Sequence, residues 1–314
     1  MKKEDLKIVF LGTPDFAVES LDLLVKNEFN IVGVVTATDK PAGRGHKMLP
    51  SAVKQYAVEH GLHLMQPERL KDESFIEELR SLNADLFIVI AFRMLPEVVW
   101  QMPRLGTFNL HASLLPKYRG AAPINWAVIN GEKETGVTTF FLKHEIDTGD
   151  VIQQQSITID ENENVGSVHD RLMHLGAQLT LDTVNAILDG NVTSIPQSQF
   201  EVIEPTPAPK IFRDTCHIDL TNKALDIHNQ IRGLSPYPGA WIDIVLADDT
   251  VVTTKIFESK INDKATPNDL IGKVYSDNGH LYLGAEDKVV EVITLQPAGK
   301  RRMTADEFLR GTKL

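Results

Sequence analysis

The stretch Leu6-Lys7-Ile8-Val9-Phe10-Leu11-Gly12-Thr13-Pro14 is an apolar run that ends in a turn. The run has the length and composition of a buried strand, and the glycine and proline then break regular structure. The following residues predict a helix over 16–25 with Asp15 as its N-cap. A strand, a turn and a helix in this order are the opening of an α/β fold.

The same alternation continues through the first hundred residues. Apolar runs predict strands at 31–36, 62–65 and 86–90, and amphipathic segments predict helices at 51–60 and 73–81. This order predicts a Rossmann-like parallel sheet with helices on both faces. Pro14 stands where a dinucleotide fingerprint needs its second glycine, so the sequence disfavours an enzyme that uses a nicotinamide cofactor.

Asn109 and His111 lie two residues apart in a short predicted strand, so both side chains face the same side. An imidazole can take a proton from an attacking amine or hydroxyl, and an amide can donate to an oxygen that gains negative charge. Asp147, in the turn Asp147-Thr148-Gly149-Asp150, is the best downstream carboxylate to fix the tautomer of the imidazole. These residues point to acyl transfer or hydrolysis, although each motif alone also fits an ordinary strand end or turn.

Together these motifs resemble the signature of the formyltransferases that use 10-formyltetrahydrofolate. The resemblance implies that Asn109, His111 and Asp147 are catalytic. It also implies a folate-contacting loop, made of Ser113, Leu114, Leu115 and Pro116. The segment 91–96 departs from the family, because many members have a Tyr-Gly pair there, beside the pterin pocket of related enzymes.

Residues 39–50 form a long predicted loop that carries Arg44, between Gly43 and Gly45, and Lys47. Such a loop could become ordered on an RNA phosphate backbone, or it could be a mobile surface loop with incidental charge. It resembles the inserted loop of the methionyl-tRNA formyltransferase family, which contacts the acceptor end of the tRNA. Formyltransferases that act on small amines lack this loop.

The Pro-spaced segment 201–210 is a predicted linker between a catalytic domain at 1–200 and a C-terminal domain at 211–314. After a helix at 222–233, about five short strands predict a small OB-like β-barrel, closed by a helix at 303–309. The segments 234–241 and 295–303 resemble the closing motifs of the same family's tRNA-binding C-terminal domain. The basic cluster of Lys300, Arg301 and Arg302 could bind tRNA phosphates or form a solvated turn.

The formal net charge of −11 argues against nucleic-acid binding by bulk attraction, so an RNA partner must be held by local basic features. A lone cysteine, Cys216, excludes an intrachain disulfide and is expected to serve packing. The N-terminal apolar run is too short for a signal peptide or a membrane span. We expect a cytoplasmic monomer without membrane contact, and no sequence motif indicates a metal site.

The resemblance implies transfer of the formyl group of 10-formyltetrahydrofolate to the amino group of methionyl-tRNA, which gives formylmethionyl initiator tRNA for translation initiation. One alternative is a formyltransferase that acts on a sugar nucleotide or on glycinamide ribonucleotide, which the basic loop and the near-neutral C-terminal domain disfavour. The other is a non-enzymatic RNA-binding protein, which the presence of all three catalytic residue types disfavours.

Overall fold

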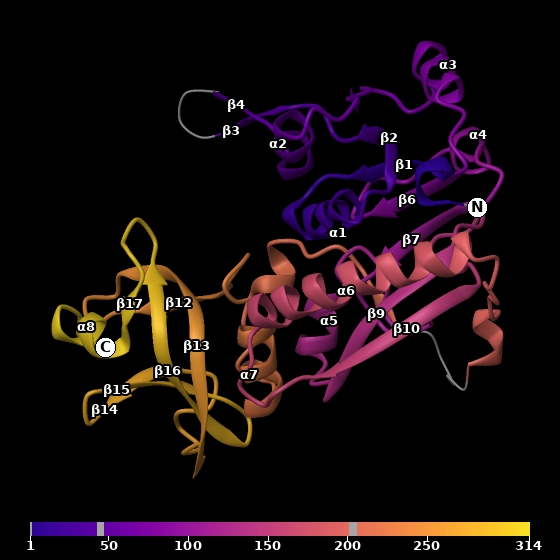
Figure 1. The fold of residues 1–314 in the computed structure, drawn as a ribbon. Coiled ribbons are helices and arrows are strands. Elements are labelled where there is room, and N and C mark those ends of the chain that lie inside the picture. Colours follow the sequence, from indigo (N-terminus) through magenta and orange to yellow (C-terminus); the bar gives the residue numbers. More distant parts are fainter. Residues whose placement is uncertain (1, 43–46, 201–205) are drawn as a thin grey trace. The chain divides into compact units, whose positions relative to one another are not determined.

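The computed structural model describes residues 2–42, 47–200 and 206–314, and it divides into two compact units (Figure 1). The first unit comprises Met1–Gly120, Gly136–Ile157 and Asp170–Pro207. The second unit comprises Ala121–Thr135, Thr158–His169 and Ala208–Leu314. Of the predicted linker 201–210, residues 201–205 lie outside the described residues.

A seven-stranded sheet in the order β10-β9-β7-β6-β1-β2-β5 forms the centre of the first unit. Its strands are β1 (Lys7–Gly12), β2 (Asn30–Val35), β5 (Leu64–Met65), β6 (Leu86–Ile90), β7 (Thr107–His111), β9 (Glu134–Phe141) and β10 (Val151–Thr158). The strands from β7 to β5 are parallel, whereas β9 pairs with β7 in the antiparallel sense. The sheet is therefore mostly parallel, and not wholly parallel as the sequence predicted, because β9 runs along β7 in the opposite direction.

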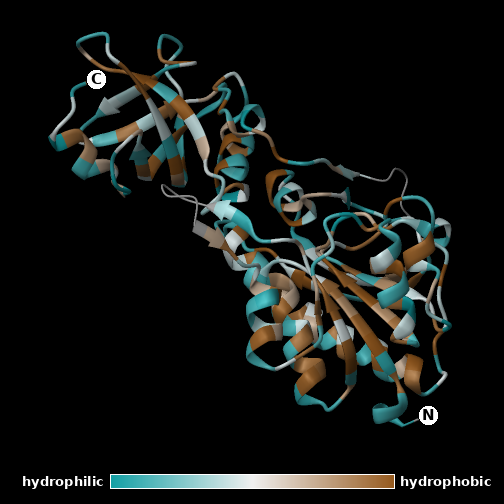
Figure 2. Cartoon of the chain, turned by 90° about the horizontal axis from the view of Figure 1, so that it is seen from above, coloured by the Kyte–Doolittle hydropathy of each residue, from teal (hydrophilic) through white to brown (hydrophobic). Residues whose placement is uncertain are grey.

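Helices lie on both faces of this sheet, as the alternating pattern predicted (Figure 1). They are α1 (Asp15–Lys26), α2 (Ala52–Glu59), α3 (Glu73–Ser81), α4 (Glu97–Trp100) and α6 (Val165–Leu188). On one face, Val9 and Phe87 pack with Phe75 of α3. On the other face, Leu110 of β7 contacts α6 so closely that a Cβ at Gly176 would lie 2.7 Å from its Cδ2. The sheet is the most hydrophobic part of the unit (Figure 2).

Two local expectations differ from the structure. Helix α1 begins at Asp15 and has Pro14, whose backbone is extended, as its N-cap, and the Asp15 carboxylate accepts from the adjacent Phe16 N–H. The predicted loop 39–50 contains a short antiparallel hairpin, made of β3 (Lys40–Ala42) and β4 (Lys47–Leu49). Residues 40–42 pair with residues 47–49 along their backbones, so this part of the predicted loop has regular structure.

The second unit contains an antiparallel sheet in the order β12-β13-β16-β15-β14, with β17 paired to β16. Its strands are β12 (Ala240–Val245), β13 (Val251–Ala265), β14 (Val274–Asp277), β15 (His280–Gly284), β16 (Lys288–Pro297) and β17 (Met303–Thr304). Register shifts interrupt the pairing of the long strand β13 with β16, and such irregularities curl a sheet. The curled antiparallel sheet agrees with the predicted OB-like barrel architecture.

Three helices complete the second unit, namely α5 (Pro123–Ile129), α7 (Ala224–Gly233) and α8 (Ala305–Arg310). Helix α7 contributes Ile227 and Ile231 to a core that also contains Ile242 of β12 and Leu295 of β16. The predicted final helix starts at Ala305, two residues later than expected, since residues 303–304 pair with β16. The two-residue strands β8 (Arg119–Gly120) and β11 (Pro207–Ala208) complete the strands described.

Within the described ranges, no helix combines the length and the apolar character needed to cross a membrane.

Candidate active site

Strand β7 carries Asn109 and His111 on one face at the carboxyl end of the parallel part of the sheet. This is the edge where ligands bind in open α/β sheets. His111 is only 7% exposed, and its ring lies edge-on to Phe140 of the neighbouring strand β9, with centroids 6.5 Å apart. The predicted strand and the shared face of the two side chains are therefore present, and Asn109 is partly exposed beside the buried imidazole.

The His111 ring is held by a main-chain carbonyl. Its Nε2 lies 2.8 Å from the carbonyl oxygen of Tyr118, which can only accept, so Nε2 carries a proton. The other ring nitrogen, Nδ1, lies 3.8 Å from Oδ2 of Asp147, which is too far for a direct hydrogen bond. The sequence predicted that a carboxylate fixes the tautomer, whereas in the structure the Tyr118 carbonyl does so and leaves Nδ1 facing the carboxylate.

Asp147 occupies a turn whose backbone is tightly specified. Its φ of 54° lies in the left-handed region, which aspartate tolerates better than most residues. Its Oδ2 accepts a hydrogen bond from the Gly120 N–H at 2.9 Å. Two residues later, Gly149 lies so close to β9 that a Cβ there would be 1.6 Å from the Phe141 carbonyl oxygen. The carboxylate is therefore positioned both by its own hydrogen bond and by the packing of the turn.

Gln197 connects this turn to the segment after β7. Its Nε2 donates to the carbonyl oxygens of Asp147 and Gly149, both at 2.8 Å. Its Oε1 accepts from the Arg119 guanidinium, with Nη2 at 2.6 Å and Nε at 3.1 Å. Sequence reasoning missed Gln197, because a single glutamine 50 residues from its partner belongs to no local pattern.

The predicted folate-contacting loop, 113–116, is held by hydrogen bonds within the first unit. The Ser113 hydroxyl donates to the Lys117 carbonyl at 2.7 Å, and Gln154 donates to the Leu115 carbonyl at 2.8 Å. Ser113, Leu115 and Pro116 are buried, and only Leu114 is partly exposed. The loop therefore has a fixed conformation, and most of its side chains are buried.

The predicted tRNA-binding residues fall in three situations. Arg44 lies outside the described residues, and Lys47 begins β4, where only its backbone is described. Lys300, Arg301 and Arg302 form the exposed turn between β16 and β17. Arg301 pairs with Glu307 at 2.9 Å, and the Arg302 guanidinium lies 3.5 Å from the centre of the Phe257 ring. The turn is therefore cationic mainly through its first and third residues.

Two further observations concern the surroundings of the site. Arg93, in the segment that departs from the family pattern, donates to the carbonyl oxygens of Pro67 and Glu68. Across the described part of the chain, no three His, Cys, Asp or Glu side chains are grouped so that they could hold a metal ion.

Comparison with known proteins places these motifs in a family. A profile described as "Formyl transferase" matches residues 6–184, and one described as "Formyl transferase, C-terminal domain" matches residues 210–313. A methionyl-tRNA formyltransferase from Bacteroides fragilis is 59% identical over 100% of this chain and 97% of that protein. The chain belongs to the methionyl-tRNA formyltransferase family.

A second family member, from Parabacteroides distasonis, is 56% identical over 100% of this chain and 98% of its own length. Among solved structures, an N-formyltransferase from Helicobacter canadensis, in complex with folinic acid and dTDP-3-aminofucose, superposes with a TM-score of 0.67. The match covers 91% of this chain and 99% of that chain at 21% identity. This methionyl-tRNA formyltransferase family member therefore shares its fold with that N-formyltransferase.

Proposed function

We propose that the protein transfers the formyl group of 10-formyltetrahydrofolate to the amino group of methionyl-tRNA, giving formylmethionyl initiator tRNA. The observation that carries the proposal is the convergence of Asn109, His111 and Asp147 at the carboxyl edge of the sheet, within one unit. The full-length relatives named methionyl-tRNA formyltransferase support the choice of the amine.

The reaction joins the amine nitrogen to the formyl carbon, and the amine must lose a proton. 10-Formyltetrahydrofolate supplies the formyl group as a substrate, and tetrahydrofolate leaves with a proton in its place. Neutral His111 presents an unprotonated Nδ1, because Nε2 donates to the Tyr118 carbonyl. Nδ1 can therefore accept a hydrogen bond or a proton from the amine, and the Asp147 carboxylate 3.8 Å away stabilises the resulting imidazolium.

Asn109 supplies the complementary group. Its side chain makes no hydrogen bond to another residue in the part of the chain that the structure describes, so its amide is available to a ligand. An amide N–H directed at the formyl oxygen stabilises the negative charge that develops there during attack. Asn109, His111 and Asp147 thus fit a formyl donor and an amine acceptor, and the 113–116 loop is proposed to shape the folate side of the site.

We also propose that Arg44, Lys47, Lys300, Arg301 and Arg302 contact phosphates of the initiator tRNA. Their scattered positions agree with local rather than bulk attraction in a chain of net charge −11. Arg301 forms an ion pair with Glu307, which offsets its charge. We therefore expect Arg301 to contribute less to tRNA binding than Lys300 or Arg302. We propose that the protein acts as a monomer in the cytoplasm, where initiator tRNA is charged and used.

The deciding experiment measures formyl transfer from 10-formyltetrahydrofolate to methionine-charged initiator tRNA. Parallel reactions contain uncharged tRNA, glycinamide ribonucleotide or an amino-sugar nucleotide. We expect transfer to the charged tRNA alone. Transfer to a small amine instead would keep the catalytic residues but overturn the proposed substrate, and transfer to none would overturn the enzymatic proposal.

Replacing Gln197 with leucine should lower kcat by about 10- to 100-fold, because displacement of a catalytic group by about 1 Å has effects of this size. The change removes both hydrogen bonds to the Asp147 turn and the acceptor for Arg119. Steady-state kinetics with charged tRNA provide the measurement, and the KM for tRNA should stay within a factor of two. Gln199→Leu, on the same short helical turn but exposed, is the matched control; equal loss in both variants would contradict the positioning role.

A further inference from the structure

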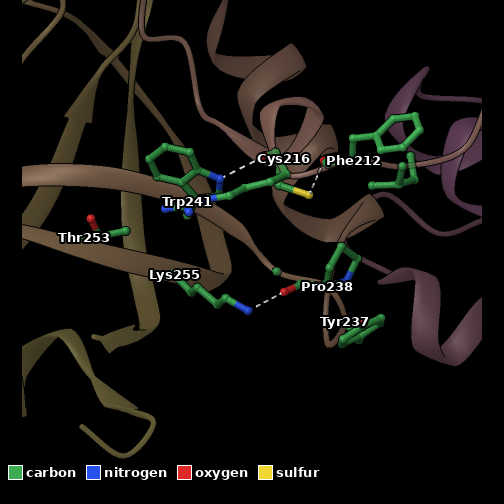
Figure 3. Close-up of a pocket in the computed structure, with 10 residues that line it drawn as sticks. Phe212, Cys216, Tyr237, Pro238, Trp241, Thr253 and Lys255 are labelled. Atoms are coloured by element: carbon green, nitrogen blue, oxygen red, sulfur yellow. Dashed lines mark hydrogen bonds between the residues drawn. The ribbon is translucent and has the colours of Figure 1, made fainter. Parts of the chain in front are cut away.

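The second unit contains a surface cavity of about 440 Å³ that none of the proposed catalytic or basic residues lines. Its walls come from the segment before α7, the turn before β12, and strands β12 and β13. Figure 3 shows the lining side chains, which include Phe212, Tyr237, Trp241 and Lys255. Because every lining residue belongs to the second unit, the cavity is a property of that unit alone.

Aromatic side chains at this cavity are unusually exposed. Tyr237 is 82% exposed and Phe212 is 61% exposed, although burial of such rings stabilises a protein more than burial of most other side chains. Trp241 is partly exposed, and its Nε1 donates to the Arg213 carbonyl at 3.0 Å, which fixes the indole plane. Exposed rings gathered around one hollow indicate a binding surface rather than core packing.

The cavity is also cationic within an acidic chain. Two cations, Arg213 and Lys255, line it, and no carboxylate does. The Arg213 guanidinium lies 5.3 Å from the centre of the Trp241 ring. The Lys255 Nζ donates to the Pro238 carbonyl at 2.7 Å, which anchors the ammonium group at the wall and leaves its other protons for a ligand. A carboxylate does approach the rim, since Asp243 accepts from the Thr253 hydroxyl at 2.5 Å.

The basic turn at 300–302 adjoins this cavity. The Ala298 N–H donates to the carbonyl of Thr253, a lining residue, at 2.9 Å. The guanidinium of Arg302 stacks on Phe257, whose ring edge would lie 3.2 Å from a Cβ at Gly239, also a lining residue. Cations therefore continue from the cavity to the turn along one side of the sheet.

We propose that this cavity binds one unpaired nucleotide of the tRNA substrate. Its base stacks on Tyr237 or Phe212, and its phosphate is held by Lys255 and Arg213. The inference rests on the proposed function, which supplies the RNA. The combination of stacking rings with cations spaced along the same surface is the chemistry by which proteins hold single-stranded nucleotides, and stacking accepts any base because every base has a π-face. A peptide partner would not require cations at both the cavity and the turn.

The test uses the full-length protein and compares variants in the formylation of charged initiator tRNA. Tyr237→Ala and Phe212→Ala should together raise the KM for tRNA about 10- to 100-fold, with kcat at saturating tRNA unchanged within a factor of two. Tyr237→Trp should restore most of the affinity, because the ring and not the hydroxyl makes the contact. Val245→Ala, which removes an exposed apolar side chain of β12 outside the cavity, is the control and should behave as wild type.

Lysine substitution separates the phosphate contact from stacking. Lys255→Gln should reduce the slope of log(kcat/KM) against log salt by about 0.7 to 0.9, whereas Tyr237→Ala should leave the slope unchanged. Lys273→Gln, at an exposed position of the same unit outside the cavity, gives the same change in net charge and should not alter the slope.

Unchanged KM in the double aromatic variant, or equal slopes for the two lysine variants, would overturn this inference while leaving the proposed function intact. Loss of kcat without a change in KM would also overturn it. If wild-type protein does not formylate the charged tRNA at all, the proposed function itself fails, so the two failures are distinguishable.

Discussion

Replacing Asp147 with asparagine lowers kcat for formyl transfer by about 10²- to 10⁴-fold, the range expected when a group that assists proton transfer is lost. Asparagine tolerates the left-handed backbone at φ 54°, and its side-chain oxygen can still accept from the Gly120 N–H. The variant therefore keeps the turn but loses the negative charge 3.8 Å from His111 Nδ1. Single-turnover kinetics with charged tRNA measure the effect.

Asp150→Asn is the matched control for this change. Asp150 lies in the same turn, but its carboxylate pairs with Lys143 at 2.6 Å and not with the imidazole. We expect its kcat to stay within a few-fold of wild type, and we expect both variants to bind tRNA and to melt as the wild type does. Equal activities of the two variants, or parallel losses of tRNA binding and kcat in Asp147→Asn, would remove Asp147 from the chemistry.

Replacing Gly149 with alanine should abolish most activity and also destabilise the protein. The added Cβ would lie 1.6 Å from the Phe141 carbonyl oxygen, a backbone atom that cannot rotate away. Either the turn or the end of β9 must move, and overpacking of this kind costs about 1–3 kcal/mol or more. Because the turn holds Asp147, we expect kcat to fall at least 100-fold in the fraction that remains folded.

The measurements for Gly149→Ala are the melting temperature and the kcat per folded molecule. Gly311→Ala serves as the control, since a Cβ at Gly311 meets no atom within 4 Å. Full activity together with a lowered melting temperature would show that the turn can shift without moving the carboxylate. That outcome would contradict the tight coupling between the packing of Gly149 and the position of Asp147.

The sequence predicted most of the elements, because periodicity and breakers are local signals. The helix at 73–81 and the strand at 86–90 have the predicted bounds. The direction of β9 could not be predicted in this way, since its apolar run is compatible with either sense of pairing. The hairpin around residues 40–49 was also missed, because basic and glycine-rich segments carry little strand signal.

The candidate site was predictable to the extent that it consists of side chains in motifs. Asn109, His111 and Asp147 were chosen from their chemistry and from the family resemblance, and the structure brings the His111 and Asp147 side chains within 4 Å. The partners that position them were not predictable. Gln197 is distant in sequence, and the charge of Arg301 is partly offset by Glu307, a pairing that depends on the folded turn and not on the basic cluster itself.

Two of the groups that define the site are not side chains at all. The Tyr118 carbonyl accepts from Nε2 of His111 and so keeps the proton on that nitrogen. The Gly120 N–H donates to the Asp147 carboxylate and holds it in place. Every amino acid other than proline carries both groups, so neither group by itself identifies a residue type in the sequence. The conformation of the segment 118–120 sets the position of both groups, and at Gly120 that conformation has a φ of 128°, which favours glycine. An ester in place of the amide at residue 120 would remove the N–H that donates to Asp147 and would so test the contribution of the backbone to the site.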